Sequence, residues 1–199
     1  MDGFHIWEAG IILARYIAFN SEQFKNKSVL ELGTGVGIGG LALALFTEAN
    51  SVTMSDYRND VVENIKKQTK KNIKLIKNKK LQIETINLDW TNYEKFEKKY
   101  DIIIGSDLIY AGSPVKELYY LIKKSLNKDG KCYIIIPSER HYSVKFLENI
   151  DNEKVLNYEI VKIDGQNYFQ SPLKNQEEGF KTYPGLKELE FYVYIFTFA

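Results

Sequence analysis

Short runs of apolar residues alternate along most of this chain with longer segments whose apolar residues recur at helical spacing. Four short runs are dense enough to be strands buried on both faces, at 28–33, 51–56, 100–107 and 131–137. A helical stripe at 115–126 separates the last two of them, with apolar residues three and four positions apart. Parallel strands need such crossovers. The alternation therefore predicts a doubly wound α/β fold, a mostly parallel sheet with helices on both faces.

Two further helices are predicted on either side of the first two strands. Residues 6–19 are helix-like and aromatic-rich, and they belong to an N-terminal helical segment, 1–27, that must pack on the rest of the chain. The helix predicted after Asp56 carries an apolar stripe and six of the eight lysines found between Lys66 and Lys80. This lysine run is typical of a solvated face, and a docking patch for an acidic protein or RNA is the alternative.

The C-terminal part of the chain breaks the alternation. Residues 155–163 and 189–198 are typical of strands, and no periodic helix joins them, so we expect them to pair antiparallel. The connection between them, 164–187, is polar and contains glycine and proline. A loop of this length is typical of a functional lid or of a disordered segment. We expect a single domain over 1–199.

Composition excludes several classes of protein. The 199 residues are 44% hydrophobic and 14% aromatic, which excludes a disordered chain, and 27 basic against 26 acidic residues give a net charge of +1. We therefore expect no membrane association and no nucleic-acid partner drawn by global charge. The single cysteine excludes a disulfide framework and fits a reducing compartment. We expect a cytoplasmic monomer without a metal site, with the nucleus as an alternative location.

A glycine-rich segment, Glu31-Leu-Gly-Thr-Gly-Val-Gly-Ile-Gly-Gly40, follows the first strand and opens a helix. Such a turn lets a ligand lie against bare main chain, at the carboxyl end of the sheet and beside a helix N-terminus. Gly35, Gly37 and Gly40 satisfy the dinucleotide pattern G-x-G-x-x-G. The acidic Glu31 instead favours a cationic ligand such as S-adenosylmethionine, whose sulfonium and ammonium are positive. A turn needed only for tight strand–helix packing is the structural alternative.

Asp56 ends the second predicted strand, at the same edge of the sheet as the glycine-rich turn. A carboxylate at this place can accept both hydroxyls of an adenosine ribose. The alternative is that Asp56 caps the helix that begins near Asn59.

The chain resembles the seven-strand (class I) S-adenosylmethionine-dependent methyltransferases, and more narrowly the small protein-lysine methyltransferases with a D-x-x-Y signature. The resemblance covers roughly residues 7 to 142. It lies in these stretches, in family order: Trp7-Glu-Ala-Gly10, Glu31 to Gly40, Ser55-Asp-Tyr57, Leu88-Asp-Trp90 and Gly105-Ser-Asp-Leu-Ile-Tyr110. It implies a Rossmann-like sheet of seven strands in the order 3-2-1-4-5-7-6, with strand 7 antiparallel.

The resemblance also implies S-adenosylmethionine as the cofactor, S-adenosylhomocysteine as its product, and a lysine ε-amine of a protein substrate as the methyl acceptor. The implied cofactor-binding residues are Trp7, Glu31, Gly33, Thr34, Gly35, Gly37, Asp56, Tyr57, Asp89, Trp90 and Ser106. Among them, Asp89 would take the adenine amino group and Trp90 would cover the ring. Asp107 and Tyr110 are the implied catalytic residues, and they would face the methyl group and the incoming amine.

Other interpretations remain open at this point. Asp107 and Tyr110 could be a strand-end Asp that caps the next helix and a Tyr that packs on it. A small-molecule or RNA N-methyltransferase of the same fold is the main alternative function, although the Ser106–Tyr110 segment lacks the prolines typical of adenine methylation. A catalytically inactive interaction module and a nicotinamide-dependent dehydrogenase are further alternatives. His141 either lines the pocket or begins the next helix.

Overall fold

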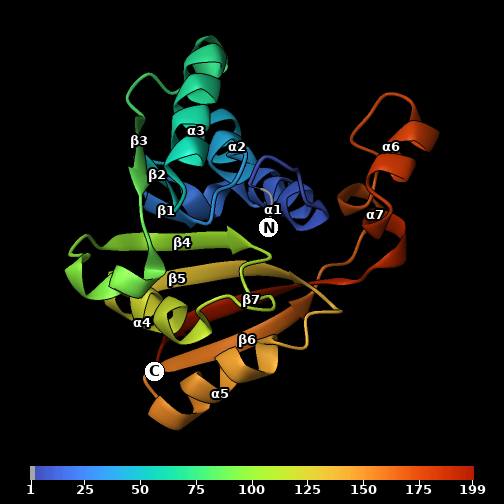
Figure 1. Ribbon diagram of the computed structural model, residues 1–199. Coiled ribbons are helices and arrows are strands. Elements are labelled where there is room, and N and C mark those ends of the chain that lie inside the picture. Colours follow the sequence, from blue (N-terminus) through green and yellow to red (C-terminus); the bar gives the residue numbers. More distant parts are fainter. Residues whose placement is uncertain (1–2) are drawn as a thin grey trace.

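The computed structural model describes residues 3–199. Within that range the strands form one seven-stranded sheet in the order β3-β2-β1-β4-β5-β7-β6 (Figure 1). The strands are β1 (Ser28–Leu32), β2 (Ser51–Asp56), β3 (Gln82–Asn87), β4 (Tyr100–Ser106), β5 (Leu126–Pro137), β6 (Leu156–Lys162) and β7 (Phe191–Phe198). Only β7 runs antiparallel to its neighbours, β5 and β6, within the described chain. The predicted strand order and the antiparallel seventh strand are confirmed.

Helices cover both faces of this sheet (Figure 1). They are α1 (Glu8–Phe19), α2 (Ile38–Phe46), α3 (Asn59–Asn72), α4 (Val115–Ser125), α5 (Ser143–Glu153), α6 (Gln176–Thr182) and α7 (Gly185–Glu188). One hydrophobic cluster joins α1, α2 and α3 to one face, and a second joins α4 and α5 to the other. Consecutive residues of β4 show why the strands are apolar throughout. Ile102 and Ile104 belong to the first cluster and Ile103 to the second, because side chains alternate between the two faces of a strand.

The helix after Asp56 is shorter than the sequence analysis predicts. α3 ends at Asn72 and carries four of the lysines, and the others lie on a 3₁₀ turn (Ile73–Leu75) and the loop after it. The prediction of six lysines on this helix is therefore wrong. The physical reason is that the apolar stripe stops being buried: Ile73 is 53% exposed, and Ile76 is buried only after the chain has turned.

The last two strands pair antiparallel as predicted, and the connection between them contains two short helices that the sequence analysis does not predict. α6 and α7 are too short to give a periodic apolar pattern, and α6 depends instead on the Asn175 side chain, which accepts the N–H of Glu178 at 3.2 Å. The segment docks on α1, which it flanks in Figure 1. The Gly185 N–H donates to Glu8 Oε1 at 3.2 Å, and the Arg15 guanidinium donates to the Tyr168 carbonyl at 2.7 Å.

The topology determines where a ligand can lie. β1 pairs with both β2 and β4, and the chain leaves β1 toward α2 on one face but leaves β4 toward α4 on the other. The two connections diverge at the carboxyl ends of β1 and β4, which is the position of the ligand crevice in open α/β sheets. Across residues 3–199, no helix has both the length and the apolar character needed to cross a bilayer.

Candidate active site

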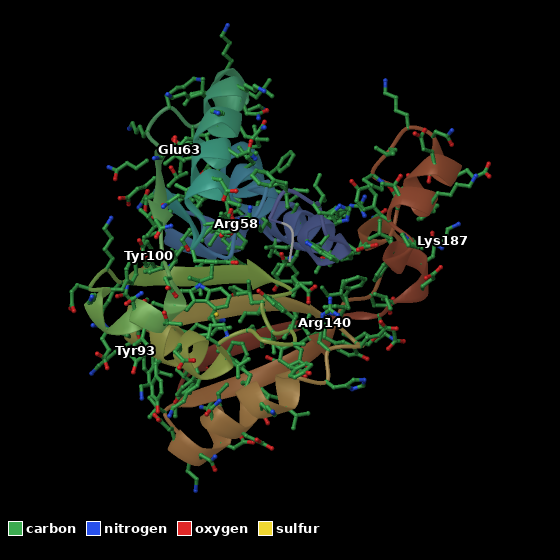
Figure 2. All side chains as sticks on the ribbon, in the orientation of Figure 1. Arg58, Glu63, Tyr93, Tyr100, Arg140 and Lys187 are labelled. Carbon is green, nitrogen blue, oxygen red and sulfur yellow. The ribbon has the colours of Figure 1, made fainter. Side chains whose placement is uncertain are left out.

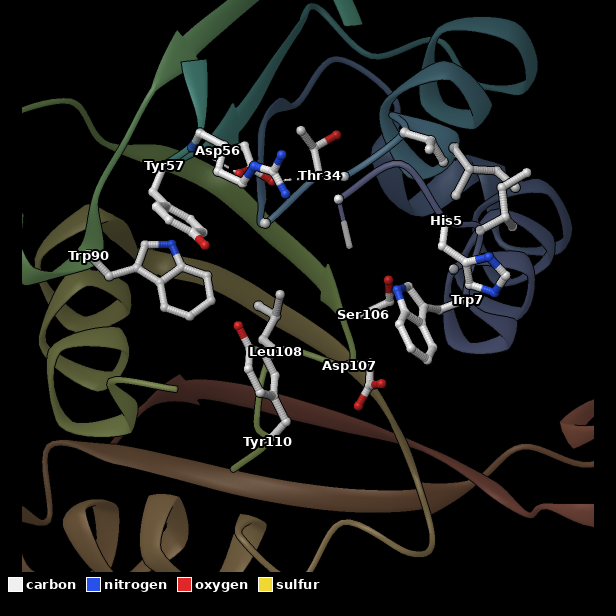
Figure 3. A pocket seen from close by; sticks show the side chains of 18 of the residues that line it. His5, Trp7, Thr34, Asp56, Tyr57, Trp90, Ser106, Asp107, Leu108 and Tyr110 are labelled. Atoms are coloured by element: carbon white, nitrogen blue, oxygen red, sulfur yellow. Dashed lines mark hydrogen bonds between the residues drawn. The ribbon is translucent and has the colours of Figure 1, made fainter. Parts of the chain in front are cut away.

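A cavity of about 420 Å³ opens at this crevice (Figure 3). This volume lies within the range of small-molecule and cofactor sites. Residues from five parts of the chain line the cavity: the segment before α1, the turn after β1, the end of β2, the turn after β3 and the segment after β4. No residue between 115 and 199 is among the described residues that line it, so the α6–α7 segment does not cover it.

The turn after β1 presents bare backbone to the cavity. Gly33 and Gly35 both have left-handed φ, +58° and +52°, a conformation that side chains other than that of glycine rarely allow. A Cβ on Gly33 would also lie 2.8 Å from Leu108 Cδ2 and 3.4 Å from the Trp90 ring. Gly33, Thr34 and Gly35 therefore form a cradle on which a flat or anionic ligand group can rest.

The other glycines of the segment serve packing. Gly37 is the N-cap of α2 with φ +83°, and it does not line the cavity. Gly39 and Gly40 are buried, and a Cβ on Gly40 would overlap the Met54 side chain of β2. These glycines let α2 lie close against the sheet. The first glycines of the segment therefore line the cavity, and the later ones serve strand–helix packing.

Glu31 lies behind this turn and outside the lining of the cavity. Its side chain is 2% exposed, and it accepts hydrogen bonds from the Thr34 hydroxyl and, at 2.9 Å, from the Gly40 N–H. Burial raises the pKa of the Glu31 carboxyl to about 7. Glu31 thus stabilises the turn from behind, through its hydrogen bonds to Thr34 and to the Gly40 backbone, and not by lining the cavity.

Asp56 connects the end of β2 to the same turn (Figure 3). One carboxylate oxygen accepts the Gly35 N–H at 3.2 Å, and the other accepts the Arg58 N–H at 3.1 Å. The N-cap position of α3 is occupied by Arg58, so Asp56 does not take that position. The carboxylate lines the cavity although it is 7% exposed, and burial raises its pKa. A buried carboxylate in this position can accept a ligand's hydroxyl groups.

Asp89 and Trp90 line the wall beside Tyr57, after β3 (Figure 3). Asp89 accepts the Thr91 N–H at 2.9 Å and the Thr91 hydroxyl at 2.7 Å, so it caps the 3₁₀ turn Trp90–Lys95. This cap orients the Trp90 ring over Gly33. Tyr57 is 62% exposed and lies beside Trp90.

Asp107 and Tyr110 lie at the opposite end of the cavity, after β4 (Figure 3). Asp107 adopts φ +51°, a strained backbone conformation for a residue with a Cβ, and its N–H donates to the Ile135 carbonyl at 2.9 Å. Burial raises the pKa of the Tyr110 phenol, which therefore stays protonated and can donate a hydrogen bond. The Tyr110 N–H is bonded to Ser113 Oγ at 3.1 Å, which closes the loop before α4.

Arg140 binds Asp107, and the sequence analysis does not predict that it belongs to this site. Its Nε donates to Asp107 Oδ1 and its Nη2 to Asp107 Oδ2, both at 2.6 Å. This bond raises the pKa of the Arg140 guanidinium. Nothing in the local sequence indicates the pairing, because Arg140 follows β5 and meets Asp107 only through the β4–β5 alignment. Its neighbour His141 is exposed and does not line the cavity.

The segment before α1 closes the cavity from the side. His5 and Trp7 line it, together with Gly10 of α1, and the His5 ring meets the Trp7 ring edge-on at 5.1 Å between centroids. Figure 3 shows Trp7 beside Ser106, above the level of Asp107. His5 is a second residue that the sequence analysis leaves out of the site.

Thirteen residues were implied in this site, and the structure brings eleven of them to one cavity. Those that line it are Trp7, Gly33, Thr34, Gly35, Asp56, Tyr57, Asp89, Trp90, Ser106, Asp107 and Tyr110. Glu31 and Gly37 stand behind the turn. The lining thus combines a backbone cradle, two carboxylates near one end and a carboxylate with a phenol at the other.

Solved structures of methyltransferases have the same fold as this chain. A predicted O-methyltransferase from Agrobacterium tumefaciens superposes with a TM-score of 0.65 at 13% identity, over 96% of this chain and 81% of that one. A TehB-like SAM-dependent methyltransferase from Corynebacterium glutamicum superposes with a TM-score of 0.60 at 16% identity, over 98% and 89%.

Similarity of sequence is closer to protein methyltransferases. A histidine protein methyltransferase 1 homologue from Dictyostelium discoideum is 33% identical over 134 residues, which is 66% of this chain and 42% of that protein. A calmodulin-lysine N-methyltransferase from Arabidopsis thaliana is 30% identical over 148 residues, 72% of this chain and 48% of that protein. The match thus spans somewhat less than half the length of each of these two curated relatives.

The family model described as "Lysine methyltransferase" matches residues 2–153, from the start of the N-terminal segment to the end of α5. This range contains all five parts of the chain that line the cavity, together with the Arg140 turn. Since the match covers most of the sequence and the sheet has the methyltransferase strand order, the chain belongs to the lysine methyltransferase family.

Proposed function

We propose that this protein is an S-adenosylmethionine-dependent methyltransferase that acts on a lysine ε-amine of a protein substrate. The observation that carries the proposal is the composition of the single cavity described above. A glycine cradle and Asp56 occupy one end, and Asp107 and Tyr110 face them from the other. One end suits a nucleoside with an amino-acid tail, and the other suits an amine.

The residues present fit the cofactor. Gly33 and Gly35 present backbone without a Cβ to the cavity, and the buried Asp56 carboxylate can accept two ribose hydroxyls. Asp89 can accept from an adenine amino group, and the Trp90 ring offers a face for stacking. The alternative ligand, a dinucleotide, would place a pyrophosphate against a turn that lies between two carboxylates, Glu31 and Asp56.

When bound, the cofactor supplies a methyl group on a sulfonium: the S–CH₃ bond breaks with its electron pair on sulfur while an N–CH₃ bond forms. The protein must present an uncharged amine in line with that bond, because only the neutral amine has a lone pair. A free lysine has a pKa near 10.4, so its proton must first leave to water. Asp107 and Tyr110 hold the amine through hydrogen bonds, and Trp7 covers the acceptor end from the side.

A histidine acceptor is a second candidate, because the relative with 33% identity is named as a histidine protein methyltransferase. An imidazole needs no deprotonation before attack near neutral pH. Both candidates have a protein as substrate. The single, buried Cys132 suits a reducing compartment, and we propose that the reaction takes place in the cytoplasm.

Methyl-labelled S-adenosylmethionine tests the acceptor. The purified protein is incubated with the label and a cell extract, and the products are separated into protein, RNA and small molecules. We expect label in protein and, after acid hydrolysis, in methyl-lysine. Label in methyl-histidine would favour the second candidate, and label only in RNA or small molecules would contradict both.

Calorimetry tests the cofactor separately. We expect S-adenosylhomocysteine to bind one site per chain and NAD to give no heat of binding. Binding of both methyl donor and product without any transfer would favour an inactive interaction module. NAD binding without S-adenosylhomocysteine binding would contradict the proposal as a whole.

A further inference from the structure

Both oxygens of the Asp107 carboxylate accept a hydrogen bond from one guanidinium. Arg140 approaches it side-on with two donors, and both N–O distances are 2.6 Å, short even for charge-assisted hydrogen bonds. The Asp107 side chain is 6% exposed and that of Arg140 28%, so the pair is partly shielded from water. Its attraction is therefore stronger than that of a surface ion pair.

Both partners are fixed by their backbones as well. The Asp107 backbone has a left-handed φ, and its N–H donates to the Ile135 carbonyl. The Arg140 N–H donates to the Pro137 carbonyl at 3.2 Å, and the Arg140 carbonyl accepts the Ser143 hydroxyl at 2.8 Å. Arg140 therefore projects from a short, bonded turn between β5 and α5, close to the end of β4 (Figure 2).

The pairing leaves part of the carboxylate available. A carboxylate has about four lone-pair sites, and the bidentate guanidinium uses one on each oxygen. Asp107 lines the cavity, whereas Arg140 does not. Asp107 can thus accept hydrogen bonds from inside the cavity while Arg140 binds it from outside.

This pair sets the charge that the segment after β4 contributes to the acceptor end. The other side chains of the segment after β4 that line the cavity are uncharged; they are Ser106, Leu108, Tyr110 and Pro114. Asp107 alone would contribute a negative charge there, and together with Arg140 it contributes almost none.

We propose that Arg140 is a positioning residue that neutralises Asp107, so that the acceptor group meets a fixed hydrogen-bond acceptor in an almost uncharged site. The proposal rests on the proposed function and deepens it. An unpaired carboxylate would favour the ammonium form of a lysine, which cannot attack. Paired with Arg140, Asp107 keeps its ability to orient the amine without stabilising the unreactive form.

The charge of the pair can be measured without a methyl acceptor. S-adenosylmethionine carries a sulfonium charge that S-adenosylhomocysteine lacks, so the ratio of their dissociation constants reports the net charge that faces the sulfur. In the D107N variant Arg140 remains positive, because a guanidinium stays protonated at any working pH. We expect D107N to weaken S-adenosylmethionine relative to S-adenosylhomocysteine by about fivefold. The double variant D107N/R140Q should restore the wild-type ratio within about twofold.

R15Q provides the matched control. In the wild-type protein the Arg15 guanidinium binds the Tyr168 carbonyl, and Arg15 does not line the cavity. R15Q removes the same charge, and it should leave the ratio of the S-adenosylmethionine to the S-adenosylhomocysteine dissociation constant unchanged in the wild-type background and still raised about fivefold in the D107N background. Thermal unfolding of each variant separates a charge effect from loss of structure. An unchanged ratio in D107N, or a ratio that R140Q fails to restore, would overturn the proposal. If neither ligand binds the wild-type protein, the proposed function itself is wrong.

Discussion

The two ends of the cavity differ in the groups that shape them: main-chain groups at the cofactor end and side-chain groups at the acceptor end. At the cofactor end the main chain does most of the work: Gly33 and Gly35 adopt left-handed conformations, and Asp56 accepts a backbone N–H from the turn. At the acceptor end, side chains decide the properties, since Asp107 and Arg140 meet through two side-chain hydrogen bonds. We therefore expect substitutions at one end to weaken cofactor binding and substitutions at the other end to slow methyl transfer.

The D107A variant should separate the two ends most strongly. Removing the carboxylate takes away the group that orients the acceptor, and we expect methyl transfer to protein to fall about 10³-fold. S-adenosylhomocysteine carries no sulfonium charge, and its dissociation constant should stay within about threefold of wild type. Labelled transfer and calorimetry measure the two quantities. Loss of S-adenosylhomocysteine binding in D107A would show that the two ends are not independent.

The G33A variant should have the reverse effect. Its Cβ would lie 2.8 Å from Leu108 and in a left-handed backbone conformation, so the cradle must deform. We expect the affinity for S-adenosylhomocysteine to fall about 100-fold. G165A is the matched control, because Gly165 has φ +108°, a Cβ there would meet only Tyr168 at 3.8 Å, and Gly165 does not line the cavity. Equal losses of affinity in the two variants would mean that backbone strain, and not the shape of the cradle, is responsible.

Glu31 tests whether the cofactor end is braced from behind. Its folded-state pKa of about 7 lies above the ordinary value of 4.5, so the folded protein binds the proton more tightly than the unfolded chain. The contribution is complete below pH 4.5 and is lost as the pH rises through 7. We expect the free energy of unfolding to fall by about 2 kcal/mol between pH 5 and pH 7 through this group.

Urea unfolding at the two pH values measures this fall. The E31Q variant should lose this part of the pH dependence, and E48Q should keep it, because Glu48 is an exposed partner of Lys25. The same fall in E31Q as in the wild-type protein would contradict the assignment to Glu31.

The smallest effect is expected for D56N. The amide keeps one acceptor oxygen for the Gly35 N–H but loses a charged acceptor for ligand hydroxyls, and we expect about tenfold weaker binding of S-adenosylhomocysteine. Transfer at saturating cofactor should change less than threefold. D101N is the control, since the Asp101 carboxylate also accepts a backbone N–H, from Ser28 at 2.8 Å, but does not line the cavity. A loss of transfer at saturation in D56N would mean that the cofactor end also aligns the reaction.

The same comparison explains how much the sequence predicts. Gly33, Gly35 and Asp56 are local signals, because their functions depend on backbone conformation and on position at a strand end, and both can be inferred from a short window. The Asp107–Arg140 pair depends on the alignment of β4 with β5, which a linear pattern does not reveal. The sequence places Glu31 correctly on the first strand, but it does not reveal that the side chain points behind the turn toward Gly40.

In the fold, the strand order agrees with what the family resemblance implies, and the dense apolar runs locate β1, β2, β4 and β5 without fixing their order. α6 and α7 are missed because they are only seven and four residues long: α6 depends on its Asn175 cap, and α7 depends on tertiary contacts such as the bond from Gly185 to Glu8. α3 is predicted too long because the apolar stripe continues to Ile76 in the sequence, whereas in the structure the helix ends at Asn72 and Ile73 is exposed. Tertiary contacts decide where these helices exist and where they end.

A crystal structure with S-adenosylhomocysteine bound is the most direct test of the account. We expect the adenosine between Asp56 and Trp90, the amino-acid tail on the Gly33–Gly35 cradle, and the sulfur facing Asp107 with its Arg140 bond intact. Density for the ligand elsewhere on the chain, or a cavity refilled by its own side chains, would contradict it.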